Sequence, residues 1–219
     1  MKNGNGRKIS RRNINLPLSL AILSAIFVFL WLAILVSGGS LSGADSLIVE
    51  KAIRLRTPVA SEMFLLLTDL GGGFLISVLV GIAAAILAVS DRRRESMHLV
   101  LSILGGEITY RIVKLMVHRS RPGAEYALVQ ADGFAFPSGH AVGSAIFYGI
   151  VAFLLWELIR RRWMKIFVTT FFLLLIFLVG FSRLYLGVHW ASDVIGGWLL
   201  ASAFILYFMS NIDNQPKIT

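Results

Sequence analysis

Long apolar runs, separated by short polar segments, dominate the pattern of this 219-residue sequence. A helix needs about 20 apolar residues to cross the hydrocarbon core of a bilayer. Six runs approach or reach that length: Pro17–Ser37, Phe74–Val89, His98–Lys114, Ser138–Trp156, Ile166–Phe181 and Trp190–Ser210. Because no repeat or linker divides them, we predict an all-α, polytopic membrane protein in which one six-transmembrane-helix bundle covers residues 17–210.

The segment between the first two spans carries a mixed pattern. From Asp45 to Arg56, apolar and charged residues alternate irregularly. This is typical of an amphipathic helix, either on the extracytoplasmic membrane surface or packed over the bundle. The second span can begin as early as Ala60, and the glycines at 71–73 lie at its mouth. There they either break the helix or allow another helix to approach closely.

Basic residues indicate how the spans are oriented, because short loops rich in Lys and Arg remain in the cytoplasm. Thirteen of the 21 basic residues fall on one side of the six spans: Lys2, Arg7, Lys8, Arg11, Arg12, Arg92, Arg93, Arg94, Arg160, Arg161, Arg162, Lys165 and Lys217. We therefore predict cytoplasmic tails at residues 1–16 and 211–219. The first span is longer than the apolar region of a cleaved signal peptide, which favours an uncleaved signal anchor.

Composition supports a membrane protein and excludes several kinds of site. Hydrophobic residues make up 57% of the chain and charged residues 15%, so a soluble fold of this size cannot hide its apolar surface. Cysteine is absent, which excludes disulfides, thiolate metal sites and a cysteine nucleophile. The net charge of +9 is largely explained by the cytoplasmic loops, so it requires no nucleic-acid partner.

The first of three polar clusters follows the third span. Lys114 and Arg121 are seven residues apart, so they share a face if the helix continues, although Pro122 disfavours helix at Arg121. The alternative is that these cations only extend from a span end to the membrane surface. We assign Arg111 and Arg119 to that surface role.

The second cluster lies at the start of the fourth span, where Pro137 is followed by Ser138, Gly139 and His140. Proline at a helix start, followed by small residues, leaves backbone N–H groups that favour an anion. His140 would stand over that anion. The alternative is an ordinary capped helix with an interfacial histidine.

The third cluster contains Arg183, His189 and Asp193 and lies between the last two spans. Four residues separate the histidine from the aspartate, so on a helix the carboxylate can bind one imidazole nitrogen and free the other. Ionisable residues at membrane depth are costly and mark functional sites. The alternative is an ion pair between Arg183 and Asp193 that braces two spans.

All three clusters fall on the side opposite the basic loops, although the topology argument did not use them. Together they provide three cations, two histidines, a carboxylate and a helix N-terminus. This combination suits a phosphate group. No further carboxylate-rich set is present to hold a metal ion.

The clusters resemble the three-part signature of the type 2 phosphatidic acid phosphatase superfamily, in its membrane branch. The matching motifs are Lys114-x(6)-Arg121-Pro122, Pro137-Ser138-Gly139-His140 and Ser182-Arg183-x(5)-His189-x(3)-Asp193. The branch that this chain is similar to includes bacterial phosphatidylglycerophosphatase B and undecaprenyl-diphosphate phosphatases.

The resemblance implies a role for each residue. His189, oriented by Asp193, is the nucleophile that forms a phosphohistidine, and His140 is the acid that protonates the leaving group. The phosphate oxygens are held by Lys114, Arg121, Ser138, Gly139 and Arg183. Neither metal nor other cofactor is expected.

The implied substrate is a lipid phosphate within the plasma membrane, reached from the extracytoplasmic face, and no obligate protein partner is evident. Phosphatidylglycerol phosphate is favoured over undecaprenyl diphosphate and phosphatidic acid, although nothing in the residues separates them. A lipid transporter or binding protein that does not hydrolyse its ligand is a rival from another class. A serine protease using Ser138 and His140 is a weaker rival, because residues two apart on a helix do not face each other.

Overall fold

The computed structural model describes residues 16–212, which form an all-α fold of eight α-helices and one short 3-10 helix. In chain order the helices are α1 (Leu16–Ser37), α2 (Ser42–Arg54), α3 (Pro58–Asp69), α4 (Gly73–Val89), α5 (Arg93–Val117), η1 (Ala124–Tyr126), α6 (Gly139–Leu158), α7 (Arg162–Tyr185) and α8 (Ala191–Ile212). Each of the six predicted spans coincides with a helix to within a few residues. The basic tail positions before residue 16 and Lys217 lie outside the described residues.

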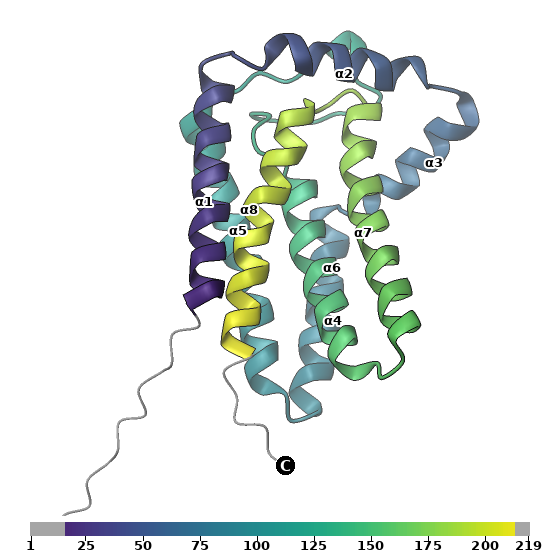
Figure 1. The fold of residues 1–219 in the computed structure, drawn as a ribbon. Helices are drawn as coiled ribbons and strands as arrows, with labels where there is room; N and C mark the ends of the chain where they lie inside the picture. Colours follow the sequence, from purple (N-terminus) through teal and green to yellow (C-terminus); the bar gives the residue numbers. More distant parts are fainter. Residues whose placement is uncertain (1–15, 213–219) are drawn as a thin grey trace, which may run out of the picture.

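The long helices form a bundle with two different ends (Figure 1). The α4–α5 and α6–α7 turns lie at the lower end, beside the start of α1 and the end of α8. Helix α2 lies across the upper end, over the α7–α8 connection and the long α5–α6 loop. Arg92 and Arg161, which the topology argument placed on one side, are therefore at one end of the bundle, and α2 is at the other.

Among the described helices, α1, α6, α7 and α8 are each long and apolar enough to cross a membrane. The pair α3 and α4 meets the same test together, although it bends by 46° at the break. Helix α5 has sufficient length, at 25 residues, but Glu107 and Arg111 interrupt its apolar sequence. Four or five spans are thus supported by helix length and composition, against the six predicted.

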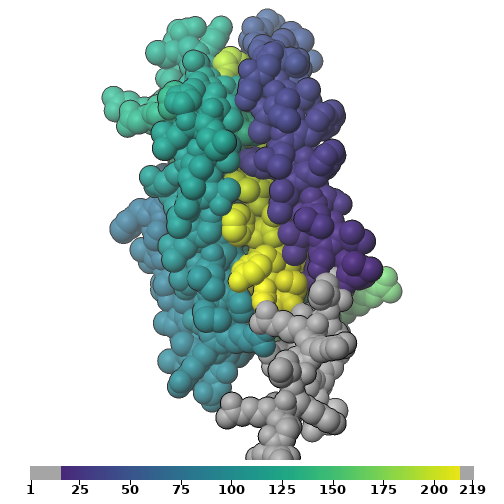
Figure 2. Space-filling view, turned by 90° about the vertical axis from the view of Figure 1, so that its left-hand side faces the viewer, coloured from purple at the N-terminus to yellow at the C-terminus, as the bar shows by residue number. Residues whose placement is uncertain are grey.

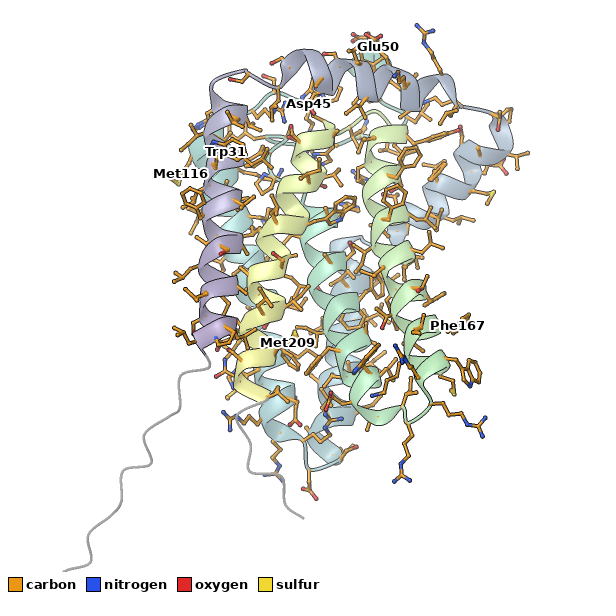
Figure 3. All side chains as sticks on the ribbon, in the orientation of Figure 1. Trp31, Asp45, Glu50, Met116, Phe167 and Met209 are labelled. Atoms are coloured by element: carbon orange, nitrogen blue, oxygen red, sulfur yellow. The ribbon has the colours of Figure 1, made fainter. Side chains whose placement is uncertain are left out.

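The outer surface of the bundle is apolar, as expected for contact with lipid. Large side chains such as Trp31, Met116 and Phe167 are 57–74% exposed and point away from the bundle (Figure 3). On another face, α8 is visible between α1 and α5 (Figure 2). These three helices line an apolar hollow of about 590 Å³.

The break between α3 and α4 occurs at Leu70–Gly72, where the glycine run was expected either to break the helix or to allow close contact. Both occur. A Cβ atom on Gly71 would overlap Cγ1 of Val179 and would lie 3.3 Å from the backbone oxygen of His140. Glycine therefore lets this turn pack directly against α7 and against the start of α6.

Helix α2 is amphipathic, and the face that it buries includes a carboxylate as well as apolar residues. The buried residues are Asp45, Val49 and Ala52, which are spaced along one face, whereas Leu47 and Leu55 are exposed. Downstream, Arg56 donates to the backbone oxygens of Tyr185 and Tyr126. The helix therefore packs over the bundle, which is one of the two arrangements that the sequence left open. Polar contacts hold it in that position.

Candidate active site

Three segments converge beneath α2, at the upper end of the bundle (Figure 1). They are the end of α5 with the loop that follows it, the first turn of α6, and the connection between α7 and α8. Each carries one of the three predicted polar clusters.

His189 lies in the α7–α8 connection, with only 2% of its surface exposed. Its Nδ1 atom is 3.2 Å from Oδ2 of Asp193, and its Nε2 atom is 3.1 Å from Nη1 of Arg121. A guanidinium can only donate, so Nε2 accepts and Nδ1 carries the proton. The ring is thus held as the tautomer whose lone pair is on Nε2.

The histidine precedes α8, whereas the sequence argument placed both residues on one helix. Asp193 is in the first turn of α8, where its Oδ2 also accepts from the backbone N–H of Trp190, at 2.9 Å. The predicted pair therefore forms across a helix N-terminus.

Burial, together with the nearby Arg183 and Arg121, lowers the pKa of His189 to about 4, although Asp193 opposes that shift. The imidazole is consequently neutral near pH 7. A neutral imidazole with a fixed, unprotonated Nε2 is a nucleophile.

Lys114 and Arg121 do not share a helix face, because α5 ends at Val117 and His118 adopts a left-handed conformation. Pro122 is therefore not what ends the helix. The two cations are brought together by backbone oxygens of the loop, which Arg121 contacts at residues 132–134 and Lys114 at residues 134–135. Both side chains are held by carbonyl groups, which no motif in the sequence indicates.

Two buried polar atoms near the start of α6 have no hydrogen-bond partner among the described residues. One is Oγ of Ser138, which is the residue before α6 but does not cap it, contrary to the alternative of an ordinary capped helix. The other is Nε of Arg183, whose Nη1 donates to Oγ1 of Thr68 at 2.6 Å. The first N–H groups of a helix, including that of Gly139, also lack partners within it. An anion would satisfy these donors.

His140, in the first turn of α6, lines a cavity of about 360 Å³ between α4, α5 and α6. The cavity extends from His140 and Gly139 to residues on the exposed flank of α4 and α5, and its walls are polar and apolar in nearly equal parts. The wall residues include Ile76, Ser77, Leu104, Glu107, Arg111 and Ile146. Ser138 Oγ is unpartnered and so makes no hydrogen bond to His140, which leaves the serine protease alternative without support.

Arg119 is not a surface cation, and our assignment of it to the membrane surface is wrong. Its side chain is only 12% exposed and forms ion pairs with Asp193 and Asp45, both at 2.6 Å. Asp193 pairs with Arg119 and His189, so the alternative ion pair with Arg183 is not formed. Arg111, in contrast, is exposed and pairs with Glu107 one turn earlier.

Asp45 and Arg119 are the site residues that sequence reasoning missed. Asp45 shares the spacing of the buried α2 residues Val49 and Ala52, which is consistent with a buried position but does not identify its partner. No group of three or more His, Asp or Glu residues within residues 16–212 is arranged to hold a metal ion.

Comparison with known proteins places this chain among membrane phosphatases. The PAP2 superfamily matches residues 95–217, more than half of the chain, and the chain belongs to that superfamily. This confirms the resemblance inferred from the three motifs, and the protein is a multi-pass membrane protein.

Two relatives and one solved structure show which members of the superfamily this chain resembles. Phosphatidylglycerophosphatase B of Bacillus subtilis is 32% identical over 89% of this chain and 96% of its own length. Undecaprenyl-diphosphatase of Sulfolobus acidocaldarius is 30% identical over 64% of this chain and 66% of its own. The crystal structure of a transmembrane PAP2-type phosphatidylglycerolphosphate phosphatase from Bacillus subtilis matches with a TM-score of 0.80 and 27% identity, covering 91% of this chain and 99% of that one.

Proposed function

We propose that this protein removes the terminal phosphate of a membrane lipid through a phosphohistidine formed on His189. The observation that carries the proposal is the buried neutral imidazole, whose Nε2 lone pair is fixed by Asp193 and lies beside Arg121. A protein that only bound or transported a lipid phosphate would not need a nucleophile prepared in this way. Membership of the PAP2 superfamily supports the same chemistry.

The reaction has two steps. In the first, Nε2 of His189 attacks phosphorus, the bond between phosphorus and the leaving oxygen breaks, and His140 gives that oxygen a proton. In the second, water attacks the phosphohistidine and returns a proton to His140, while the phosphorus–nitrogen bond breaks. Inorganic phosphate leaves, and both histidines regain their starting forms.

Cationic side chains take the role that metal ions have in many phosphoryl-transfer enzymes. Lys114, Arg121 and Arg183 hold the non-bridging phosphate oxygens as charge develops on them. The unpartnered Ser138 hydroxyl and the Gly139 amide complete the set. When substrate binds, the phosphoryl group lies next to Nε2 of His189, where Nη1 of Arg121 lies in this structure.

A lipid substrate is supported by the cavity at His140. Its inner end lies at the proposed acid, and the apolar side chains of Ile76, Leu104 and Ile146 line part of its walls between there and the flank of α4 and α5. The leaving group therefore lies in an environment that accepts the apolar part of a lipid. A small soluble phosphate ester would leave most of this cavity empty.

Phosphatidylglycerol phosphate is the favoured substrate, because the relative that covers most of this chain is named for its hydrolysis. The alternative is undecaprenyl diphosphate, for which the Sulfolobus relative is named. Both lipids present a terminal phosphate to the same site, so the choice between them concerns only the leaving group.

For the arrangement in the membrane we propose six spans, in which α5 is added to α1, the α3–α4 pair, α6, α7 and α8. Helix α5 packs against α4, α6 and α8 and runs along the bundle from end to end. With both termini cytoplasmic in the plasma membrane, the site beneath α2 opens on the extracytoplasmic side. The domain then covers residues 17–210, between a basic cytoplasmic tail at residues 1–16 and a second cytoplasmic tail at residues 211–219.

The test is phosphate release by the purified protein in detergent with excess chelator, on phosphatidylglycerol phosphate, undecaprenyl diphosphate and phosphatidic acid. We expect turnover on at least one, inhibition by vanadate, and highest kcat/KM on phosphatidylglycerol phosphate. His189→Ala should be inactive, whereas Glu50→Gln, at an exposed position of α2, should be normal. Loss of activity on chelation, restored by Mg²⁺, would contradict the mechanism, as would an active His189→Ala variant.

A further inference from the structure

A buried chain of charges joins α2 to the proposed nucleophile. One nitrogen of the Arg119 guanidinium donates to Asp193 on α8, and the other donates to Asp45 on α2, both at 2.6 Å. Asp193 then uses its other oxygen to bind His189. The order of contacts is therefore Asp45, Arg119, Asp193, His189.

Ser192 contacts both Asp45 and Arg119. Its hydroxyl donates to Oδ2 of Asp45 at 2.6 Å and accepts from Nη1 of Arg119 at 2.7 Å, while its backbone N–H donates to Oδ1 of Asp45. Asp45 thus receives three donors although it is only 3% exposed. Burying two carboxylates is costly unless each is paired and hydrogen-bonded, and here both are.

The geometry restricts how Asp193 can move. A carboxylate held through one oxygen can rotate, whereas this one is held through Oδ1 by Arg119 and through Oδ2 by His189 and the Trp190 N–H. Arg119 is itself fixed because Asp45 occupies its second nitrogen. The orientation of the imidazole therefore depends on a residue of α2, the helix that lies over the site.

We propose that Asp45 and Arg119 are positioning residues for phosphoryl transfer, acting on His189 through Asp193. The inference rests on the proposed role of His189 as nucleophile. During attack the ring becomes positively charged, and the fixed Asp193 carboxylate stabilises that charge. Arg119 sets the direction of the carboxylate. Asp45 partly neutralises Arg119, so that the guanidinium does not cancel the attraction between Asp193 and the ring.

The test uses matched variants of α2. Asp45→Asn removes the buried charge, whereas Glu50→Gln makes the same change on the exposed side of the helix (Figure 3). We expect Asp45→Asn to slow phosphoenzyme formation at saturating substrate, and with it kcat, by about 10-fold to 100-fold, with KM changed less than about twofold. Small displacements of a reacting group have effects of that size. Glu50→Gln should match the wild type in both.

A second pair of variants keeps the test valid if Asp45→Asn does not fold. Ser192→Ala leaves every charge in place but removes the hydroxyl between Asp45 and Arg119, so a smaller loss of kcat with unchanged KM is expected. Arg119→Lys keeps the charge but cannot span two carboxylates, and it should also lower kcat. Thermal unfolding in detergent identifies the variants that remain folded.

The outcomes separate the two proposals. If the wild type forms no phosphoenzyme, or His189→Ala remains active, the proposed function fails. If the wild type reacts through His189 but folded Asp45→Asn, Ser192→Ala and Arg119→Lys all keep the kcat of Glu50→Gln, the positioning role is wrong. A rise in KM with unchanged kcat would also overturn it, because Asp45 and Arg119 would then act in substrate binding.

Discussion

At the scale of single residues, the chemistry of the site depends on which nitrogen of His189 is free. Spacing in the sequence predicted the contact with Asp193, and the structure contains it, at 3.2 Å. It also adds Arg121, which donates to Nε2 and thereby identifies the tautomer. The motif residues were predictable because their side-chain types and spacings carry the chemistry.

Their supporting residues were not predictable in the same way. Asp45 contacts Ser192 across 147 positions of sequence, and Arg119 contacts Asp193 across 74. Such pairs follow from how helices pack and not from any local pattern. Arg119 was therefore assigned to the surface, although it is among the best-bonded cations of the site.

The depressed pKa of His189 predicts how the reaction depends on pH. Its neutral form should persist as pH falls from 7 to 5, because burial brings the pKa from 6.5 to about 4. We expect kcat/KM for phosphoenzyme formation, which reports the pKa values of the free enzyme, to fall only near pH 4. Loss of that step around pH 6.5 would contradict a buried neutral nucleophile.

The same shift affects folding. An unfolded histidine takes up a proton near pH 6.5, whereas the folded one does so only near pH 4. Lowering the pH through this window therefore favours the unfolded state, and the contribution of this group to the free energy of unfolding is lost as pH falls.

At the scale of helices, apolar runs located the long elements well, because lipid contact requires about 20 apolar residues of each span. The sequence did not predict which side chains of these helices face the bundle. The apolar residues Leu47 and Leu55 of the α2 region face outward, while Asp45 faces the bundle. Similarly, the sequence left open whether the glycine run breaks the helix or allows a close contact, and it did not identify Val179 and His140 as the residues that Gly71 contacts.

Substitution of the glycine run tests that packing. A Cβ on Gly71 would press on Val179, which is fully buried, and on the backbone of His140, whereas a Cβ on Gly73 would meet nothing within 4 Å. We expect Gly71→Ala to lower the free energy of unfolding by about 1–3 kcal/mol and to reduce activity. Gly73→Ala is the control and should be nearly neutral. Equal unfolding temperatures for the two variants would show that the contact at Gly71 is unimportant.

At the scale of the whole molecule, the arrangement of the bundle agrees with the charge argument. The basic turns at 92–94 and 160–165 lie at one end, and the three polar clusters meet at the other (Figure 1). The sequence could not reveal how α2 closes over that second end, because the contacts involve segments far apart in the chain.

The proposed sidedness can be tested with single cysteines, since the chain has none. Glu50→Cys is at the α2 end, and Arg161→Cys is at the opposite end. In intact cells we expect an impermeant thiol reagent to label position 50 and to leave position 161 protected until the membrane is opened. The reverse pattern would place the site in the cytoplasm and exclude the proposed access from the extracytoplasmic leaflet.

The central claim is that phosphate is transferred to His189 before water reaches it. The most direct measurement is rapid quenching of the reaction with a lipid labelled at its terminal phosphate, followed by mapping of the label on the protein. We predict a bond that is labile in acid and stable in alkali, located on His189, absent from His189→Ala and hydrolysed at the rate of turnover. A wild-type enzyme that releases phosphate steadily with no labelled histidine, or with the label elsewhere, would contradict the account.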